Sequence, residues 1–521
     1  MKDFLNKHDI ALLVLLTSIL SIVATLYCYF HGTILNYGDA ESHINIAKRV
    51  VSSLTPGLAQ LGGIWLPLPH LLMIPFVYFD PLWRTGLAGS IIGGISYVIS
   101  AAYIYKLVNL LLGKRPTALV AYAVFVLNPN ILYLQSTPMS ELPLIAFFIL
   151  STYYFILFIK NDSNLAYLLS AAFFGFCATL SRYDGWFLVG FEMIALIIFF
   201  IRKKMSYKPI EGKTILFSTL AFFGIALWFL WDFLILGNPF YFSDSPFSAK
   251  AQQQEWLVKG QLPSYKNALS SFLYYLVTSW HIVGFFIFLF ALLGVCIFWF
   301  DKTVRHKFLL FLLLFVPFLF YFTALFLGQA VIFIPDLTPP SYPWHLFNVR
   351  YGVMMIPFAA VFFSYFFHYL HKYFKYVLLS FFIVELLLFS IGKEQVLTFD
   401  DGQYGLSASK NIDATGWMIH HYTGGLVLLD DYARTLSIIK SGLPINKVIY
   451  IGNKPYWENS LRNPQKYATW VILQRNDAVW QALFATPIQQ KKLYAYYKKV
   501  YTSPEILIFK LNNKASLLVK N

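Results

Sequence analysis

Hydrophobic residues along the chain gather into eleven runs of about membrane-crossing length, separated by polar connections. The runs lie at about 10–30, 86–112, 116–134, 141–159, 165–180, 185–201, 214–236, 271–300, 308–327, 350–369 and 376–392. A transmembrane helix needs about 20 mostly apolar residues. The pattern therefore predicts an all-α polytopic membrane protein with about eleven transmembrane helices.

The composition agrees with this pattern and excludes a soluble globular protein. Of the 521 residues, 58% are hydrophobic and only 12% are charged, whereas soluble domains carry about 25% charged residues. The net charge is +15, but no basic face with interleaved aromatic residues stands out. The sequence therefore predicts the lipid bilayer as a partner and does not predict nucleic acid.

Positive charge is distributed unequally between alternate connections. If the N-terminus is cytoplasmic, the inner connections carry 15 Lys and Arg in 44 residues, and the outer connections carry 7 in 122. Cytoplasmic loops are the ones enriched in Lys and Arg. We therefore expect a multi-pass protein of the cell (plasma) membrane with a cytoplasmic N-terminus and its long polar segments outside.

The last part of the chain, residues 393–521, differs from the transmembrane part at 1–392. It holds 16 Lys and Arg against 9 Asp and Glu, and an odd number of crossings places it outside. Short β-type runs at 426–429, 448–451, 470–473 and 506–511 alternate with polar stretches. This alternation predicts a small extracytoplasmic α/β domain.

The first outer loop, residues 31–85, is predicted to contain two interfacial helices. From Asp39 the apolar residues recur at helical spacing until Thr55-Pro56-Gly57, which gives an amphipathic helix. A second apolar run extends from about Trp65 to Tyr78 and is too short to cross. We therefore expect this loop to form one side of an active site at the membrane surface.

Three ionisable side chains lie close together at the start of this loop: Asp39, Glu41 and His43. Asp39 is either the N-cap of the helix or a general base, and these roles are compatible because a cap fixes the base in space. We expect Asp39 and Glu41 to be catalytic and His43 to bind substrate. The same two carboxylates present hard oxygen ligands, so a divalent cation, Mg²⁺ or Mn²⁺, is a possible cofactor.

Further candidates lie at the predicted outer ends of later helices. Glu141 begins the fourth helix, where it either interacts with the helix dipole or takes a catalytic role. Arg182 and Asp184 share one outer turn, as a self-contained salt bridge or as part of a substrate site near a lipid phosphate. Asp232, near the outer end of the seventh helix, is a substrate-binding candidate, because carboxylates in membrane helices are rare and usually functional.

The strongest candidate cation is Arg350, which begins the tenth helix and has no acidic neighbour in sequence. It either extends to lipid head groups or holds the phosphate of a donor, since guanidinium geometry suits phosphate. His345 precedes it and Tyr351 follows it. We expect all three to bind substrate.

These features resemble the GT-C superfamily of membrane glycosyltransferases, especially the protein O-mannosyltransferases and the ArnT-like aminoarabinose transferases. The resemblance rests on the acidic motif after the first helix, two interface helices, the aromatic bundle and the external C-terminal domain. It implies transfer, with inversion, of a sugar from a polyprenyl phosphate carrier. It also implies that Asp39 is the catalytic aspartate and that Glu141 and the pair Arg350-Tyr351 match a second acidic position and a phosphate-holding arginine.

The function predicted from these features is that of an inverting glycosyltransferase acting on the outer face of the membrane. A sugar on a lipid phosphate has a good leaving group, so one base and cationic stabilisation of the phosphate suffice. The acceptor hydroxyl belongs to a lipid, a protein or a cell-wall polymer. The alternative is a transporter or flippase of lipid-linked sugars, which would bind the same carrier without chemistry.

Overall fold

The computed structural model describes residues 2–302, 304, 306–408, 413–431 and 436–512. The chain divides into two compact units. The helical unit comprises Met1–Ile34, Gly63–Pro69 and Gly89–Ala408, and the tail unit comprises Leu35–Gly62, His70–Ala88 and Ser409–Asn521. The first outer loop is thus largely grouped with the C-terminal region.

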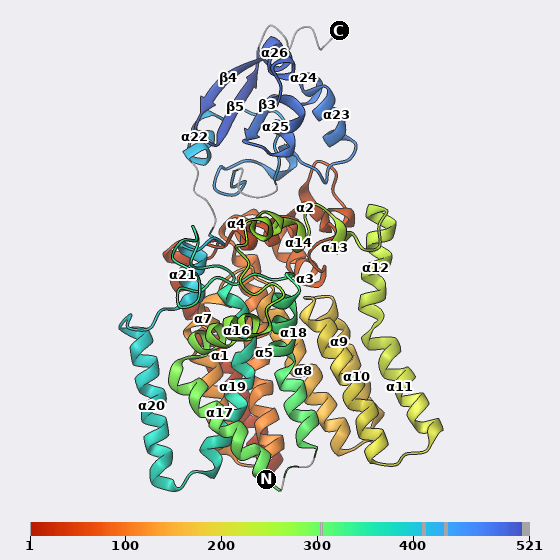
Figure 1. The fold of residues 1–521 in the computed structure, drawn as a ribbon, viewed down its shortest axis with the longest axis vertical. Helices are drawn as coiled ribbons and strands as arrows, with labels where there is room; N and C mark the ends of the chain where they lie inside the picture. The colour runs from red at the N-terminus through yellow and green to blue at the C-terminus, as the bar shows by residue number, and fades with distance from the viewer. Residues whose placement is uncertain (1, 303, 305, 409–412, 432–435, 513–521) are drawn as a thin grey trace. The chain divides into compact units, whose positions relative to one another are not determined.

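The helical unit is a bundle of long apolar helices (Figure 1). Within the described ranges, seven stretches are long and apolar enough to cross a membrane. They are α1 (Lys2–Phe30), α5 (Leu87–Leu112), α8 (Glu141–Lys160), α10 (Asp184–Arg202), α18 (Lys307–Phe326), η2 (Val349–Met355) continued by α19 (Ile356–Tyr369), and α20 (Lys372–Ser390). The predicted all-α membrane fold is confirmed.

The number of crossings differs from the predicted eleven. Two predicted spans are bent pairs, α11 (Tyr207–Ala221) with α12 (Phe223–Leu236) at 41°, and α16 (Ala268–Val283) with α17 (Phe285–Phe300) at 114°. If each bent pair is one span, the described chain has up to nine. The other two predicted spans contain shorter helices, α6 (Arg115–Val126) with α7 (Pro129–Leu134), and α9 (Leu165–Thr179). By length and composition, the described residues thus give fewer crossing helices than the eleven apolar runs.

The sharp bend between α16 and α17 occurs at Gly284. This residue has φ +104°, a conformation that favours glycine, and a Cβ there would lie 2.6 Å from Glu385 Oε1. Glu385 Oε2 accepts a hydrogen bond from the Phe286 N–H at 2.7 Å, so the carboxylate satisfies a donor at the start of α17. The buried Glu385 therefore holds the break in a span predicted to be continuous.

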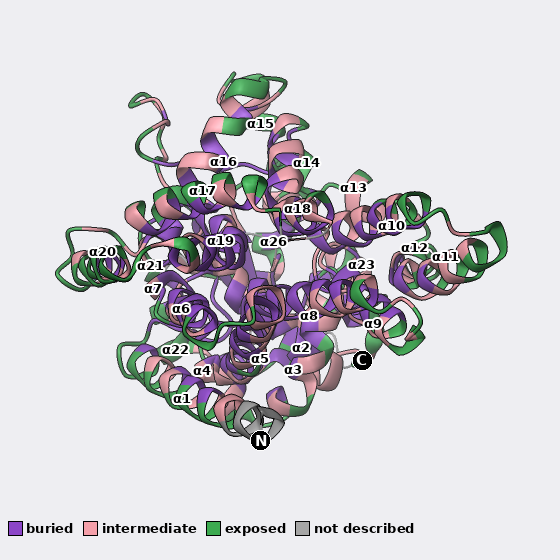
Figure 2. Ribbon diagram, turned by 90° about the horizontal axis from the view of Figure 1, so that it is seen from below, coloured by how far each residue is buried: buried purple, intermediate pink, exposed green. Residues whose placement is uncertain are grey.

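Burial separates central helices from peripheral ones in the helical unit. Figure 2 shows α8 and α19 as mostly buried and α11 and α20 at the rim with exposed sides. The buried share is 89% for Val349–Tyr369 but 22% for Lys372–Ser390. Short helices occupy the connections: α13 (Tyr241–Asp244), α14 (Ala249–Gln252), α15 (Gln254–Val258) and α21 (Leu397–Gln403). The central helices carry the residues of the candidate site.

The tail unit contains a mixed five-stranded sheet with the order β2-β1-β3-β5-β4. Its strands are β1 (Val427–Leu428), β2 (Val448–Ile449), β3 (Trp470–Gln474), β4 (Tyr497–Thr502) and β5 (Ile506–Leu511). The pairs β1–β2 and β1–β3 are parallel, and β3–β5 and β4–β5 are antiparallel. The four predicted strands are confirmed, and β4 is an additional one.

Helices of the tail unit come from both ends of the chain. The first loop supplies α2 (Gly38–Ser52), η1 (Leu58–Leu61), most of α3 (Leu68–Val77) and α4 (Asp80–Thr85). The C-terminal region supplies α22 (Asp413–His421), η3 (Ile445–Lys447), α23 (Tyr456–Arg462), α24 (Pro464–Tyr467), α25 (Ala478–Leu483) and α26 (Pro487–Tyr496). Leu54 packs against the core that contains Leu428, Ile449 and Val471. The two regions thus share one hydrophobic core.

Candidate active site

Four charged side chains meet in the helical unit, and we call them the ion cluster: Glu141, Arg182, Asp184 and Arg350. Glu141 begins α8 and Asp184 begins α10, while Arg350 lies in η2. Glu141 Oε1 lies 3.0 Å from Arg182 Nη1 and 3.2 Å from Arg350 Nε. Arg182 Nε lies 3.4 Å from Asp184 Oδ2. Two negative and two positive groups therefore balance, as buried charges require.

The ion cluster lies at the end of the helical unit opposite the start of the first membrane span. Helix α8 runs from Glu141 to Lys160, and Lys160 Nζ donates to the Leu110 carbonyl at 2.5 Å. Close to Leu110 in sequence, Arg115 forms an ion pair with Asp9 at 2.6 Å. The far end of α8 is thus on the side of Asp9, and Glu141 is on the other side.

Three stacked tyrosines line the ion cluster. The ring centroids of Tyr275 and Tyr321 lie 4.9 Å apart, as do those of Tyr321 and Tyr351. The guanidinium carbons of Arg182 and Arg350 lie 5.4 and 5.2 Å from the Tyr351 ring centroid. Cations at this distance are attracted to the ring. Both arginines are therefore oriented by the Tyr351 ring as well as by Glu141.

In the tail unit, Asp39 lies in the first turn of α2. The predicted N-cap role is wrong, because Tyr37 is the N-cap residue and makes no side-chain cap bond. Residues four apart share a helix face, so His43 lies one turn further along the Asp39 face. His43 Nδ1 lies 2.8 Å from His70 Nε2. Burial, followed by the nearby His43, lowers the pKa of His70 well below its usual value.

Glu41 points into the tail unit. Its carboxylate oxygens lie 2.9 and 2.8 Å from the Ser437 hydroxyl, and Oε1 accepts the Ile439 N–H at 3.2 Å. Asp39 and Glu41 therefore do not present two open carboxylates to Mg²⁺ or Mn²⁺, and the residues do not fit the predicted metal pair. Among the described residues, no group of three His, Cys, Asp or Glu side chains is arranged to hold a metal ion.

Two predicted site residues of the helical unit lie apart from the ion cluster. Asp232 is buried in α12, and its Oδ1 lies 2.6 Å from where a Cβ on Gly63 would be. His345 is exposed in the connection before η2, and within the described residues it makes no hydrogen bond or ion pair with the cluster. The structure thus brings together Glu141, Arg182, Asp184, Arg350 and Tyr351, but not these two.

Sequence reasoning missed the neutral partners of the charged residues. Arg182 Nη1 donates to Ser140 Oγ at 3.0 Å, and Arg350 Nη1 donates to Ser407 Oγ at 3.2 Å. Nothing in the sequence distinguishes these serines from others. His70 was also missed, although the sequence contained a signal for it, because a buried histidine within an apolar run needs a polar partner.

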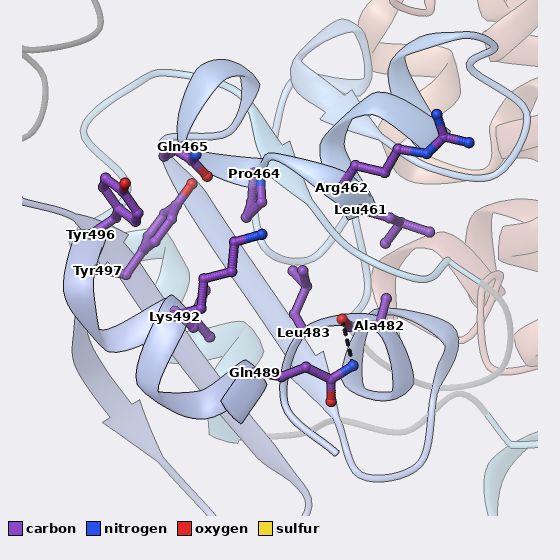
Figure 3. Close-up of a pocket in the computed structure, with 11 residues that line it drawn as sticks. Leu461, Arg462, Pro464, Gln465, Ala482, Leu483, Gln489, Lys492, Tyr496 and Tyr497 are labelled. Carbon is purple, nitrogen blue, oxygen red and sulfur yellow. Dashed lines mark hydrogen bonds between the residues drawn. The ribbon is translucent and has the colours of Figure 1, made fainter. Parts of the chain in front are cut away.

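A pocket of about 90 Å³ lies within the tail unit between α23, α25 and α26 (Figure 3). Lys492 and Arg462 contribute the charged side chains of its lining, and no carboxylate lines it. The Gln489 amide donates to the Ala482 carbonyl at 2.9 Å. The pocket therefore lacks a carboxylate that could act as the base for sugar transfer.

Comparisons with known proteins agree on the architecture. The structure matches the crystal structure of ArnT from Cupriavidus metallidurans bound to undecaprenyl phosphate, with TM-score 0.57 and 10% identity over 96% of this chain and 98% of that chain. The apo form of the same ArnT matches with TM-score 0.55, also at 10% identity, over 96% and 98% of the two chains. The archaeal oligosaccharyltransferase AglB from Archaeoglobus fulgidus, in complex with an inhibitory peptide and a dolichol-phosphate, matches with TM-score 0.50 and 11% identity over 98% and 75%. No curated protein matches the chain.

The chain has an ArnT-like fold, and the predicted resemblance to the ArnT-like group is confirmed. It is a multi-pass membrane protein. More particularly, residues 84–231 match the family described as Dolichyl-phosphate-mannose-protein mannosyltransferase. Glu141 and the Arg182–Asp184 pair lie within the matched region, while Arg350 lies beyond it.

Proposed function

We propose that the protein is an inverting glycosyltransferase that moves a sugar from a polyprenyl-phosphate carrier to an acceptor hydroxyl on the outer face of the membrane. The GT-C fold and the family match support this class of activity. The observation that carries the proposal is the ion cluster, in which one oxygen of Glu141 bridges Arg182 and Arg350. Such a cluster at one end of a membrane bundle suits a lipid-linked anion.

Arg182 and Arg350 are the groups proposed to hold the carrier phosphate. Arg350 is buried and Arg182 is half-buried. Each guanidinium group is fixed by Glu141, by a serine hydroxyl and by the Tyr351 ring. Donors fixed in advance stabilise developing charge without reorganising during the reaction. Glu141 also prevents mutual repulsion of the two cations before a donor binds.

Asp39 is the proposed general base. It takes the proton of the acceptor hydroxyl as the acceptor oxygen forms a bond to the anomeric carbon of the sugar. The bond between that carbon and the phosphate oxygen breaks on the opposite face, so the configuration inverts. The electron pair leaves on the phosphate oxygen, which the arginines stabilise, and polyprenyl phosphate is released.

The carrier is proposed from chemistry and from the solved structures together. ArnT was crystallised with undecaprenyl phosphate and AglB with a dolichol-phosphate. The acceptor is proposed to be a hydroxyl of a lipid, a protein or a cell-wall polymer. The charge asymmetry of the connections supports a cytoplasmic N-terminus and an extracytoplasmic tail in the cell membrane.

The test is a transfer assay with the purified full-length protein in lipid vesicles, supplied with polyprenyl-phosphate sugars and candidate acceptors and read by product mass. We expect Asp39→Asn to reduce transfer at least about 10²-fold, the scale of losing a general base. Asp413→Asn, an exposed carboxylate in α22, is the matched control and should leave transfer unchanged.

Two results would reject the proposal. One is wild-type transfer by folded Asp39→Asn. The other is movement of the lipid-linked sugar across the vesicle membrane without any glycosylated product, which is the behaviour of a flippase. Parallel reactions with a chelator test whether a divalent cation is needed.

A further inference from the structure

The polar side of α2 is buried against the C-terminal region of the same unit. Glu41 is held by the Ser437 hydroxyl and the Ile439 N–H. Arg49 forms an ion pair with Asp431, and its guanidinium carbon lies 4.0 Å from the Tyr450 ring centroid. We call these contacts the α2 clamp. They replace the water or lipid head groups that an isolated amphipathic helix would meet.

Contacts beyond the C-terminal end of α2 extend the α2 clamp. Asn453 Nδ2 donates to Thr55 Oγ1 at 2.9 Å, and Gln60 Nε2 donates to the Gly452 carbonyl at 3.1 Å. Leu54 packs on the tail core. The helix is thus fixed by polar contacts along its length and by apolar contacts after its end.

Glu41 is buried almost completely, with 7% of its surface exposed. Burial raises the pKa of its carboxyl, and the bonds from Ser437 and Ile439 oppose this rise. A buried polar group needs such partners, because leaving it unpaired is unfavourable. Without the clamp, Glu41 would favour an orientation of α2 that returns it to water.

Helical geometry separates Glu41 from Asp39. Residues two apart in an α-helix differ by about 200° around the axis. With Glu41 directed into the C-terminal region, Asp39 is directed to nearly the opposite side, the side of His43. Fixing Glu41 therefore fixes the direction of Asp39.

We propose that Glu41 is a positioning residue and that residues 436–453, with Asp431, are a working part of the active site because they set the orientation of α2 and hence of the base Asp39. This inference rests on the proposed function for its catalytic consequence. The contact itself is measurable without any assay of sugar transfer.

The experiment replaces Ser437 by Ala in the full-length protein in vesicles. Ser437 lies 396 positions from Glu41, so the variant leaves α2 itself unaltered. We expect amide hydrogens of α2 to exchange about ten- to hundredfold faster, the scale of a hydrogen bond to a charged group. We expect kcat to fall by a similar factor with an unchanged donor KM, because the base is displaced while the phosphate site is not.

The chain offers a matched control and a rescue. Ser460→Ala removes another buried hydroxyl of the C-terminal region, one with no hydrogen-bond partner in the described structure, and should change neither readout. Ser437→Thr restores a hydroxyl and should recover both.

The outcomes separate the two proposals. Unchanged α2 exchange in Ser437→Ala, or an equal change in Ser460→Ala, would overturn the α2 clamp. Faster exchange with an unaltered kcat would overturn the positioning role. If α2 exchange responds as expected but the wild-type protein forms no product, the proposed function fails while the clamp contact stands.

Discussion

Replacing Glu141 by Gln tests whether the ion cluster is a coupled unit. The substitution keeps the shape of the side chain and one acceptor oxygen but removes the charge shared by Arg182 and Arg350. Arg182 still has Asp184 at 3.4 Å. Arg350 loses the carboxylate 3.2 Å from its Nε, and its side chain is only 4% exposed.

The expected loss follows from this geometry. Removing one partner of a buried ion pair costs about 3–5 kcal/mol, because it leaves a charge without compensation. The retained amide oxygen favours the lower end, about 3 kcal/mol. At about 2 °C per kcal/mol, the scale for larger domains, the midpoint of thermal unfolding should fall by about 6 °C.

The assay is thermal unfolding of the detergent-solubilised protein, compared with Glu192→Gln. Glu192 is as buried as Glu141, but its hydrogen-bond partner is the Ser151 hydroxyl at 2.8 and 3.0 Å. Its amide replacement leaves no cation unpaired, so the midpoint should shift by less than about 2 °C.

A double variant completes the test. Arg350→Met in the Glu141→Gln background removes the cation that has lost its Glu141 carboxylate, so it should recover much of the loss, as apolar replacement of buried pairs commonly does. The reasoning is refuted if Glu141→Gln and Glu192→Gln lose equal stability, or if the effects of Glu141→Gln and Arg350→Met simply add.

Two further predictions concern stability. Burial, with the nearby Asp430, raises the pKa of Asp477 from 3.8 to about 7. Because the folded protein binds this proton more tightly than the unfolded chain, the group stabilises the folded state fully below the unfolded pKa. About 4 kcal/mol of the free energy of unfolding is then lost as the pH rises through 7. Asp477→Asn keeps a side chain that can cap the helix and should flatten the pH dependence of stability. The measurement is hydrogen exchange of the β3 amides as a function of pH. A variant as pH-sensitive as the wild type contradicts the raised pKa of Asp477. Gly284→Ala should destabilise the protein by at least about 1–2 kcal/mol, because φ is +104° and Glu385 lies 2.6 Å from the new Cβ. Gly190→Ala, whose new Cβ has nothing within 4 Å, should leave the midpoint of thermal unfolding unchanged or raise it. Equal effects of the two substitutions would exclude strain at Gly284.

Local patterns predicted much of the fold. The apolar runs located the membrane helices, and four β-type runs located β1, β2, β3 and β5. Strand β4 was missed because its sequence, Tyr-Lys-Lys-Val-Tyr-Thr, contains two lysines that hide the alternation. The bend at Gly284 was missed because its cause, Glu385, lies 101 positions away in the chain.

The candidate site was predictable as single residues but not as contacts. Glu141 and Arg350 were identified separately, and their ion pair joins positions 209 apart. The amphipathic pattern of α2 predicted a helix, but not the surface that covers its polar side. Hydrophobic periodicity shows which face of a helix is polar. It gives no information about which distant segment supplies the partners of the polar side chains on that face.

The α2 clamp also has a consequence for biosynthesis. Its partners are separated by 396 and 382 positions, so α2 leaves the ribosome long before the residues that bury Glu41 and Arg49 exist. The contacts that fix the helix carrying Asp39 can therefore form only after most of the polypeptide has been translated and translocated. In a nascent or prematurely terminated chain, Glu41 and Arg49 therefore face water or lipid head groups, and the orientation of α2 is fixed only when Asp431 and residues 436–453 have folded against it.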